Sequence, residues 1–210
     1  MTVTSADLIA AFGDVADAME THRDALCALD GEIGDGDHGI AMALGFSAAQ
    51  RALEDLADDA KPSDVFNTAA RSFLNAVGAS CGPLYATALM RAGAAFKTQD
   101  SLSDEDASKM IAAMAEGIAH RGKASLGDKT MLDVWQPAAD AAASARARSF
   151  GGILQAAASA ADRAANATAN MPAKLGRAAR LGSRSVGHVD PGAASAALVL
   201  RALASGIPDR

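Results

Sequence analysis

The chain has 210 residues, a mass of 21.1 kDa and a formal net charge of -6 at pH 7. This length can bury a full hydrophobic core without disulfides, and it predicts a single domain over residues 1–210. The acidic balance argues against nucleic-acid binding, which depends on a basic surface. Cys27 and Cys81 lie in unlike contexts without a C-x-x-C motif, so we expect free thiols and a reducing compartment.

We expect no targeting signal in the first twenty residues of the sequence. Residues 1–20 contain Asp7, Asp14 and Asp17 but no basic n-region, and no apolar run in the chain reaches the length of a membrane span. We therefore expect a cytoplasmic protein that binds neither a membrane nor nucleic acid.

Apolar residues at helical spacing predict a first helix, which Ser5 can cap; these residues are Leu8, Phe12, Val15, Met19 and Leu26. The same pattern predicts helices over residues 40–57, 63–77, 83–97, 103–121, 129–147, 152–169 and 191–204. Two of them have proline in the first turn, a position that proline favours. With few β-branched clusters and no alternating runs, about eight helices predict an all-α antiparallel bundle or helical barrel.

One loop concentrates carboxylate and glycine in an otherwise alanine-rich chain. It reads Gly34-Asp35-Gly36-Asp37-His38-Gly39 and follows Asp30. The loop matches the dinucleotide pattern G-x-G-x-x-G, but no strand precedes it and bare carboxylates repel a phosphate. A hard cation such as Mg²⁺ removes that conflict, because it binds carboxylate and phosphate oxygens together. Since glycines let the backbone fold both loop aspartates onto one centre, the segment predicts a metal site that also receives phosphate.

Two alternatives bear on this loop. An EF-hand that started at Asp35 would need a bidentate glutamate where Phe46 stands, so the sequence excludes one. The aspartates could instead cap the helix predicted from residue 40 onward, although one cap needs only one aspartate. In either case, the N-terminus of that helix would direct free N–H groups at a bound anion.

Three more loops carry more glycine or charge than a connection requires: residues 78–83, 121–131 and 176–192. In an up-and-down bundle alternate loops share one end, so these loops can converge on one site. Residues 117–124 nearly spell a P-loop, but Ala124 replaces the hydroxyl that would touch Mg²⁺. Asp190 and Pro191 predict a helix N-cap, which is compatible with nucleotide contact. Arg177 lies in a basic stretch that can bind phosphate or form a solvated face.

Four ordered segments resemble one known family, the nucleotide-binding L subunit of dihydroxyacetone kinase and the equivalent C-terminal domain of single-chain dihydroxyacetone kinases. The resemblance spans nearly the whole chain, and residues 29–39, 78–85, 127–134 and 176–192 carry it. It implies a barrel of eight antiparallel helices that holds ADP or ATP at one end through two Mg²⁺ ions.

By this resemblance the metal ligands are Asp30, Asp35 and Asp37. The positions that match the nucleotide site are His38, Gly39, Ile40, Ala41, Ala79, Ser80, Gly122, Met131, Arg177, Asp190, Pro191 and Gly192. Charge balance agrees with two ions, because three carboxylates and a phosphate tail of about -3 to -4 repel strongly around one divalent ion. We expect no covalent nucleophile on the chain, since phosphoryl transfer depends mainly on positioning and neutralisation.

The resemblance also implies an activity, that of a kinase subunit whose acceptor, a short ketose such as dihydroxyacetone, is bound by a separate K subunit. In one form ADP stays bound, and a phosphohistidine protein of the sugar phosphotransferase system recharges it. A related form consumes free ATP, on a ketose such as erythrulose. A different class of function is a nucleotide-sensing module that binds a transcription regulator. We expect the first form.

Overall fold

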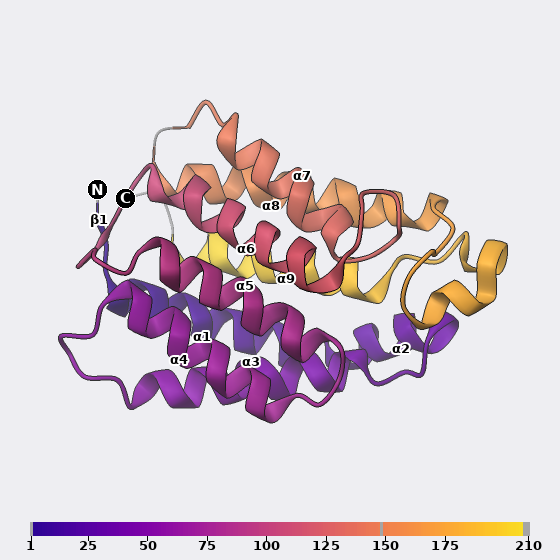
Figure 1. The fold of residues 1–210 in the computed structure, drawn as a ribbon, viewed down its shortest axis with the longest axis horizontal. Coiled ribbons are helices and arrows are strands. Elements are labelled where there is room, and N and C mark those ends of the chain that lie inside the picture. Colours follow the sequence, from indigo (N-terminus) through magenta and orange to yellow (C-terminus); the bar gives the residue numbers. More distant parts are fainter. Residues whose placement is uncertain (1, 148, 208–210) are drawn as a thin grey trace.

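The structure, a computed structural model, describes residues 2–147 and 149–207. Within them the chain forms nine α-helices, two 3₁₀ helices and two short strands (Figure 1). The α-helices are α1 (Ser5–Thr21), α2 (Arg23–Ile33), α3 (His38–Glu54), α4 (Pro62–Ala76), α5 (Cys81–Ala95), α6 (Asp106–Gly122), α7 (Leu132–Ala143), α8 (Phe150–Ala167) and α9 (Pro191–Gly206). The 3₁₀ helices are η1 (Thr168–Asn170) and η2 (Arg177–Ser185). Strands β1 (Thr2–Val3) and β2 (Leu102–Ser103) pair antiparallel.

Eight of the α-helices form a closed antiparallel ring. Each helix from α3 to α8 packs on the next along the chain, and α1 closes the ring between α9 and α3. Helix α2 stands outside this ring, at the right-hand end in Figure 1, against α3 and α9. The all-α, eight-helix antiparallel barrel expected from the sequence is therefore confirmed. None of the helices in the described part of the chain is long and apolar enough to cross a membrane.

Side chains fill the interior of the barrel. Phe46, Phe73, Tyr85 and Trp135 are all buried there, with 5.0 Å between the ring centroids of the two phenylalanines and 6.3 Å between those of Tyr85 and Trp135. Small residues let the helices around these rings approach closely. A Cβ added at Gly117 of α6 would lie 2.7 Å from the Cα of a residue on α5, so the two backbones meet almost directly.

Three local predictions were wrong. The first predicted helix is interrupted at His22, and a separate helix, α2, carries Asp30. Thr4 rather than Ser5 caps α1, because its hydroxyl accepts the N–H of Asp7 while the Asp7 carboxylate accepts the N–H of Thr4. The third concerns residues 176–192, which were expected to form a loop but contain η2. The strand pair was not predicted either, since two-residue strands leave no readable alternation.

Candidate functional site

One end of the barrel holds a cavity of about 870 Å³. Its walls include residues from the segments that precede α3, α5, α7 and α9. Neighbouring ring helices are antiparallel, so these four alternate helices run in the same direction and all begin at this end. Each presents its N-terminus, the positive end of its dipole, to the cavity. The cavity is therefore suited to an anion such as a phosphate chain.

Three aspartates meet at one wall of the cavity. Carboxylate oxygens of Asp30, Asp35 and Asp37 all lie within 4.8 Å of one another. Asp30 on α2 is buried, whereas the two loop aspartates are exposed. Gly36 between them has a φ of +79°, a left-handed conformation that lets the loop turn both carboxylates toward Asp30. Three like charges this close repel one another, so the cluster has the chemistry of a cation site.

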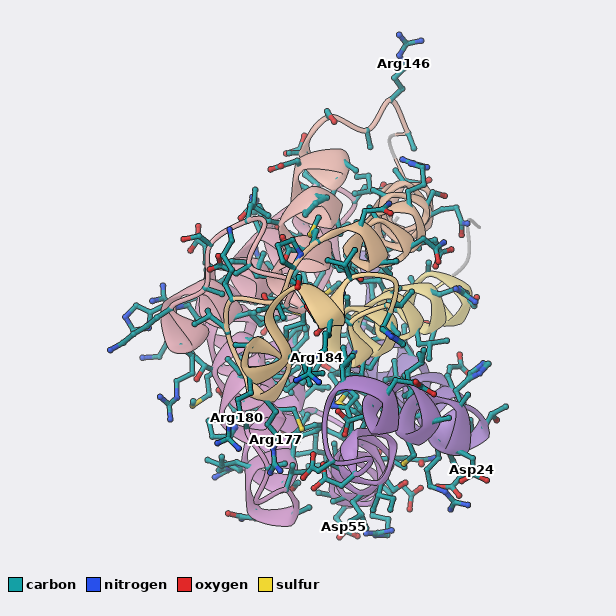
Figure 2. The ribbon with its side chains drawn as sticks, turned by 90° about the vertical axis from the view of Figure 1, so that its right-hand side faces the viewer. Asp24, Asp55, Arg146, Arg177, Arg180 and Arg184 are labelled. Atoms are coloured by element: carbon teal, nitrogen blue, oxygen red, sulfur yellow. The ribbon has the colours of Figure 1, made fainter. Side chains whose placement is uncertain are left out.

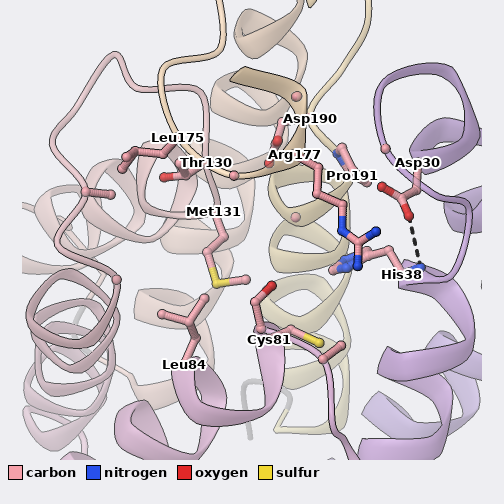
Figure 3. Close-up of a pocket in the computed structure, with 18 of the residues that line it drawn as sticks. Asp30, His38, Cys81, Leu84, Thr130, Met131, Leu175, Arg177, Asp190 and Pro191 are labelled. Carbon is pink, nitrogen blue, oxygen red and sulfur yellow. Dashed lines mark hydrogen bonds between the residues drawn. The ribbon is translucent and has the colours of Figure 1, made fainter. Parts of the chain in front are cut away.

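Asp30 also orders the loop that follows it. Its Oδ2 accepts the backbone N–H groups of Asp37 at 3.0 Å and of His38 at 3.3 Å (Figure 3). Asp37 occupies the N-cap position of α3, but its side chain makes no capping hydrogen bond. Capping therefore does not account for the Asp37 side chain, whose carboxylate belongs to the cluster instead.

Arg177 brings positive charge to the aspartate cluster. Its Nη1 lies 2.5 Å from Asp35 Oδ2, and the side chain reaches from the start of η2 into the cavity (Figure 3). Arg180 and Arg184 follow along η2 near the same end of the molecule (Figure 2). Arg177 and Arg180 line the cavity, whereas Arg184 does not. The basic stretch is therefore partly a wall of the site and partly a solvated face.

The start of α9 closes another side of the cavity. Asp190 is the N-cap of α9, as predicted, and its carboxylate accepts the N–H of Ala193 at 2.8 Å. Pro191 follows at the first helical position. Burial raises the pKa of Asp190 to about 7, and the nearby carboxylates of Asp133 and Asp30 act in the same direction. This carboxyl group can therefore hold a proton close to neutral pH.

His38 joins two of the converging helices. It is the first residue of α3, and its Nε2 lies 2.8 Å from the Oγ of Ser195 in the second turn of α9. The Ser195 hydroxyl also donates to the carbonyl of Gly192. Burial lowers the pKa of His38, so the imidazole is neutral near pH 7. Its hydrogen bond to Ser195 links the start of α3 to the start of α9.

Most residues that the sequence predicted for the nucleotide site line this cavity. They are His38, Ala79, Ser80, Gly122, Met131, Arg177, Asp190, Pro191 and Gly192, together with the three aspartates. Gly39, Ile40 and Ala41 do not. Ile40 faces a separate groove on the outer side of α3, and Ala41 is buried. Contact of any of these residues with nucleotide stays a prediction.

Gly39 has a packing role that its sequence pattern did not indicate. A Cβ at this position would collide with the backbone carbonyl of Arg23 and lie 2.9 Å from the Sγ of Cys27, both on α2. The third glycine of the G-x-G-x-x-G match is therefore required by the close crossing of α3 over α2. The near match to a P-loop in residues 117–124 does not form one. Gly122 is the last residue of α6, whereas a P-loop glycine lies in a loop before a helix.

Sequence reasoning missed several residues of the wall, among them Leu84, Thr130 and Lys129. The last two stand in a segment that was singled out, but spacing alone does not show which of its side chains turn inward. Cys81 lines the cavity as well. Burial raises the pKa of its thiol to about 11, which keeps it protonated and unreactive at neutral pH.

The model of one protein family, described as the DAK2 domain, matches residues 32–205. The chain belongs to the DAK2 domain family. Its relatives include the ADP-binding subunit DhaL of the PEP-dependent dihydroxyacetone kinase of Escherichia coli (strain K12), 41% identical over 190 residues that cover 90% of each chain. The ADP-binding subunit DhaL of the PTS-dependent dihydroxyacetone kinase of Lactococcus lactis is 36% identical over 194 residues, which cover 91% of this chain and 92% of that one.

The DAK2 fold is also similar to a solved structure. The dihydroxyacetone kinase from C. freundii in complex with AMP-PNP and Mg²⁺ matches with a TM-score of 0.72 and 26% identity. The match covers 94% of this chain and 33% of that one, so the DAK2 domain corresponds to part of the longer enzyme. These comparisons confirm the family that the four sequence segments resemble.

Proposed function

We propose that this DAK2 domain is the nucleotide-holding subunit of a ketose kinase. It holds ADP or ATP with two Mg²⁺ ions, and the terminal phosphoryl group passes to a short ketose, such as dihydroxyacetone, bound on a separate K subunit. The observation that carries the proposal is the meeting of three aspartates with Arg177 and four helix N-termini at one cavity. The ADP-binding role in the names of both relatives, and the Mg²⁺ complex of the C. freundii enzyme, support it.

The donor set fits magnesium. Mg²⁺ binds oxygen ligands at about 2.0–2.1 Å and keeps positions for phosphate oxygens and water. Oxygens that lie within 4.8 Å of one another can share such ions without a change of fold. Asp30, Asp35 and Asp37 would hold the two ions, which neutralise charge on the phosphate oxygens during transfer.

Other groups of the chain would position the nucleotide. The segment with Ala79 and Ser80 precedes α5, and Pro191 and Gly192 begin α9, so both present a helix N-terminus to phosphate oxygens. Arg177 supplies a guanidinium that can pair with phosphate oxygens of ADP and of the transferred phosphoryl group as well as with Asp35.

An apolar part of the wall suits the base. Leu84 and Met131 line the cavity and point toward one another in Figure 3, and Gly122 lies against Leu84, where an added Cβ would come within 3.1 Å of Cδ2. A purine could pack flat against these side chains, because Leu84 and Met131 form an apolar surface in the cavity. The base would then lie away from the aspartate cluster, with the phosphates directed toward it.

The chain would depend on partners for turnover. The K subunit supplies the ketose, and a cytoplasmic phosphohistidine protein of the phosphotransferase system returns the phosphoryl group to bound ADP. The PEP-dependent and PTS-dependent names of the two relatives favour this donor over free ATP. A ketose such as erythrulose is the alternative acceptor, with free ATP as donor.

The first test is the nucleotide and magnesium content of the purified chain after exhaustive dialysis, measured by native mass spectrometry. One ADP with two Mg²⁺ per chain is expected if the nucleotide is a permanent cofactor. A site that binds MgATP reversibly would identify ATP as a substrate instead. A protein that binds neither ADP nor ATP would contradict the proposal.

The second test is reconstitution with a ketose-binding K subunit. The chain should form ketose phosphate from dihydroxyacetone when a phosphohistidine donor is present, and the donor and acceptor can then be exchanged for ATP and erythrulose. A chain that formed no ketose phosphate in any combination, yet bound a transcription regulator only when loaded with nucleotide, would be a sensing module rather than an enzyme subunit.

A further inference from the structure

Lys129 is buried inside the wall of the cavity, with 1% of its surface exposed. Its Nζ lies close to four backbone carbonyl oxygens: Thr168 at 3.0 Å, Met171 at 3.1 Å, Ser185 at 2.7 Å and His188 at 2.6 Å. An ammonium group carries three protons, so it can donate one to each of two oxygens and share the third proton between the other two. The carbonyls take the place of the water that a buried cation has lost.

The four carbonyls come from two separate stretches of chain. Two belong to residues 168–171, which precede η2, and two belong to residues 185–188, which begin at the last residue of η2. The ammonium therefore joins the two ends of this segment, which carries Arg177 at the first position of η2. Two further hydrogen bonds join the same two stretches of chain. The N–H of Gly187 donates to the carbonyl of Ala169, and the N–H of Ala173 donates to the hydroxyl of Ser185.

Lys129 is itself held by a rigid turn. Its backbone has a φ of +62°, and the N–H groups of Gly127 and Thr130 on either side donate to the carboxylate of Asp133 in the first turn of α7. The ring helix α7 thus fixes the turn, and the turn fixes the direction of the lysine side chain. A flexible arm with a compact ammonium can converge on carbonyls from several directions, which the planar guanidinium of arginine cannot do.

We propose that Lys129 is a positioning residue for phosphoryl transfer, because its ammonium fixes both ends of the η2 segment and so holds Arg177 over Asp35. This proposal rests on the proposed function, in which Arg177 contacts the phosphate oxygens of bound ADP as well as the transferred group. In this proposal Lys129 need not touch the nucleotide, and its role is to keep the η2 segment, one wall of the site, in place. Burial lowers the pKa of Lys129, while the nearby Asp190 carboxylate opposes that shift and favours the charged form.

The test compares Lys129→Met with Lys123→Met. Lys123 stands at the other end of the same connection, with a φ of +53°, but its side chain is exposed, so its substitution controls for loss of a lysine from a left-handed turn. We would measure the rate of ADP dissociation in the presence of Mg²⁺ and amide hydrogen exchange across the chain without nucleotide. Lys129→Met should speed ADP dissociation at least tenfold and speed exchange mainly in residues 168–190. Lys123→Met should change neither by more than about twofold.

A double-mutant cycle with Arg177→Met separates positioning from general stability. If Lys129 acts through Arg177, the double variant should release ADP no more than about threefold faster than Arg177→Met alone. If the double variant sped ADP release by the product of the two single effects, the proposal would be overturned. Amide hydrogen exchange that rose evenly over the whole barrel would also overturn it. If Lys129→Met does not fold, Lys129→Gln keeps two donors, and it should show a smaller effect with the same dependence on Arg177.

The outcomes also separate this proposal from the proposed function. Wild-type protein that fails to bind ADP would contradict the proposed function. Wild-type protein that binds ADP, together with Lys129→Met that releases it at the wild-type rate, would overturn the role of Lys129 alone.

Discussion

Arg177 on η2 and Asp35 on the loop before α3 form an ion pair across the mouth of the cavity, with 2.5 Å between Nη1 and Oδ2. The pair joins two segments that are far apart in the sequence and that carry opposite charge. In the arginine 65% of the side-chain surface is exposed and in the aspartate 34%, so water screens the attraction. Its position beside the aspartate cluster therefore bears on chemistry more than on folding.

Arg177→Met should reduce phosphoryl transfer strongly while leaving the fold intact. Loss of a guanidinium that stabilises charge on the transferred group lowers turnover by about 10²-fold or more. Because the pair is exposed, the free energy of unfolding should change by less than about 1 kcal/mol. Turnover in the reconstituted assay and a urea unfolding curve check both statements. A large loss of stability with turnover retained per folded molecule would show that the residue is structural.

Asp35→Asn and Asp37→Asn should each abolish retention of nucleotide with its magnesium, while helical content stays unchanged. Each removes one charge from a cluster that needs a cation, and neither side chain caps a helix by a hydrogen bond. Native mass spectrometry and circular dichroism provide the two measurements. Retention of stoichiometric ADP and Mg²⁺ by both variants would refute the assignment of the metal ligands.

Asp30→Ala should differ from the two loop variants because it damages the loop as well as the metal site. Asp30 accepts the N–H groups of Asp37 and His38, and these lose their partner in the alanine variant. Stability of the nucleotide-free protein should fall by about 1–2 kcal/mol, the usual cost of losing such an acceptor at a helix start. The comparison is made by chemical denaturation in a chelator, where Asp35→Asn should unfold at or slightly above the wild-type midpoint.

Asp190 should make the stability of the nucleotide-free protein depend on pH. Its pKa is raised to about 7 in the folded protein by burial, so the folded state binds this proton more tightly than the unfolded chain. Stability from this group is then present at low pH and falls as the pH rises from about 4 to about 7. The Asp190→Asn variant can still cap α9, and it should remove this contribution to the dependence of stability on pH. Unfolding midpoints between pH 4.5 and 8, in a chelator, test it; parallel curves for the two proteins would contradict it.

Gly39→Ala and Gly31→Ala should have opposite effects. A Cβ at Gly39 collides with the carbonyl of Arg23 where α3 crosses α2, so overpacking should destabilise the fold by about 1–3 kcal/mol. A Cβ at Gly31 on α2 meets nothing within 4 Å, and alanine there should stabilise the helix by about 0.5–1 kcal/mol. Thermal unfolding without nucleotide decides between this packing role for Gly39 and a role limited to ligand contact, which would leave the melting temperature unchanged.

Much of the site could be read from the sequence because its chemistry is local. The run from Gly34 to Gly39 contains two of the clustered carboxylates and the glycine that turns them to one side, and the Asp190-Pro191 pair predicts its own helix cap. Such signals depend on a residue and its near neighbours, which sequence displays directly. The all-α class followed in the same way from apolar spacing, while the single-domain organisation stays a prediction.

Tertiary structure decided which of these residues meet and why some of them are there. Gly39 looked like a nucleotide glycine, but its small size is needed by a helix crossing. Lys129 stood inside a noticed segment without an evident role, because its partners are backbone carbonyls whose positions no side-chain pattern records. Antiparallel packing of the ring brings four helix starts to one end, and η2 meets the loop before α3 there, so that Arg177 contacts Asp35. Contacts between distant segments depend on the packing of the whole barrel, so local patterns could predict the parts of the site but not their assembly.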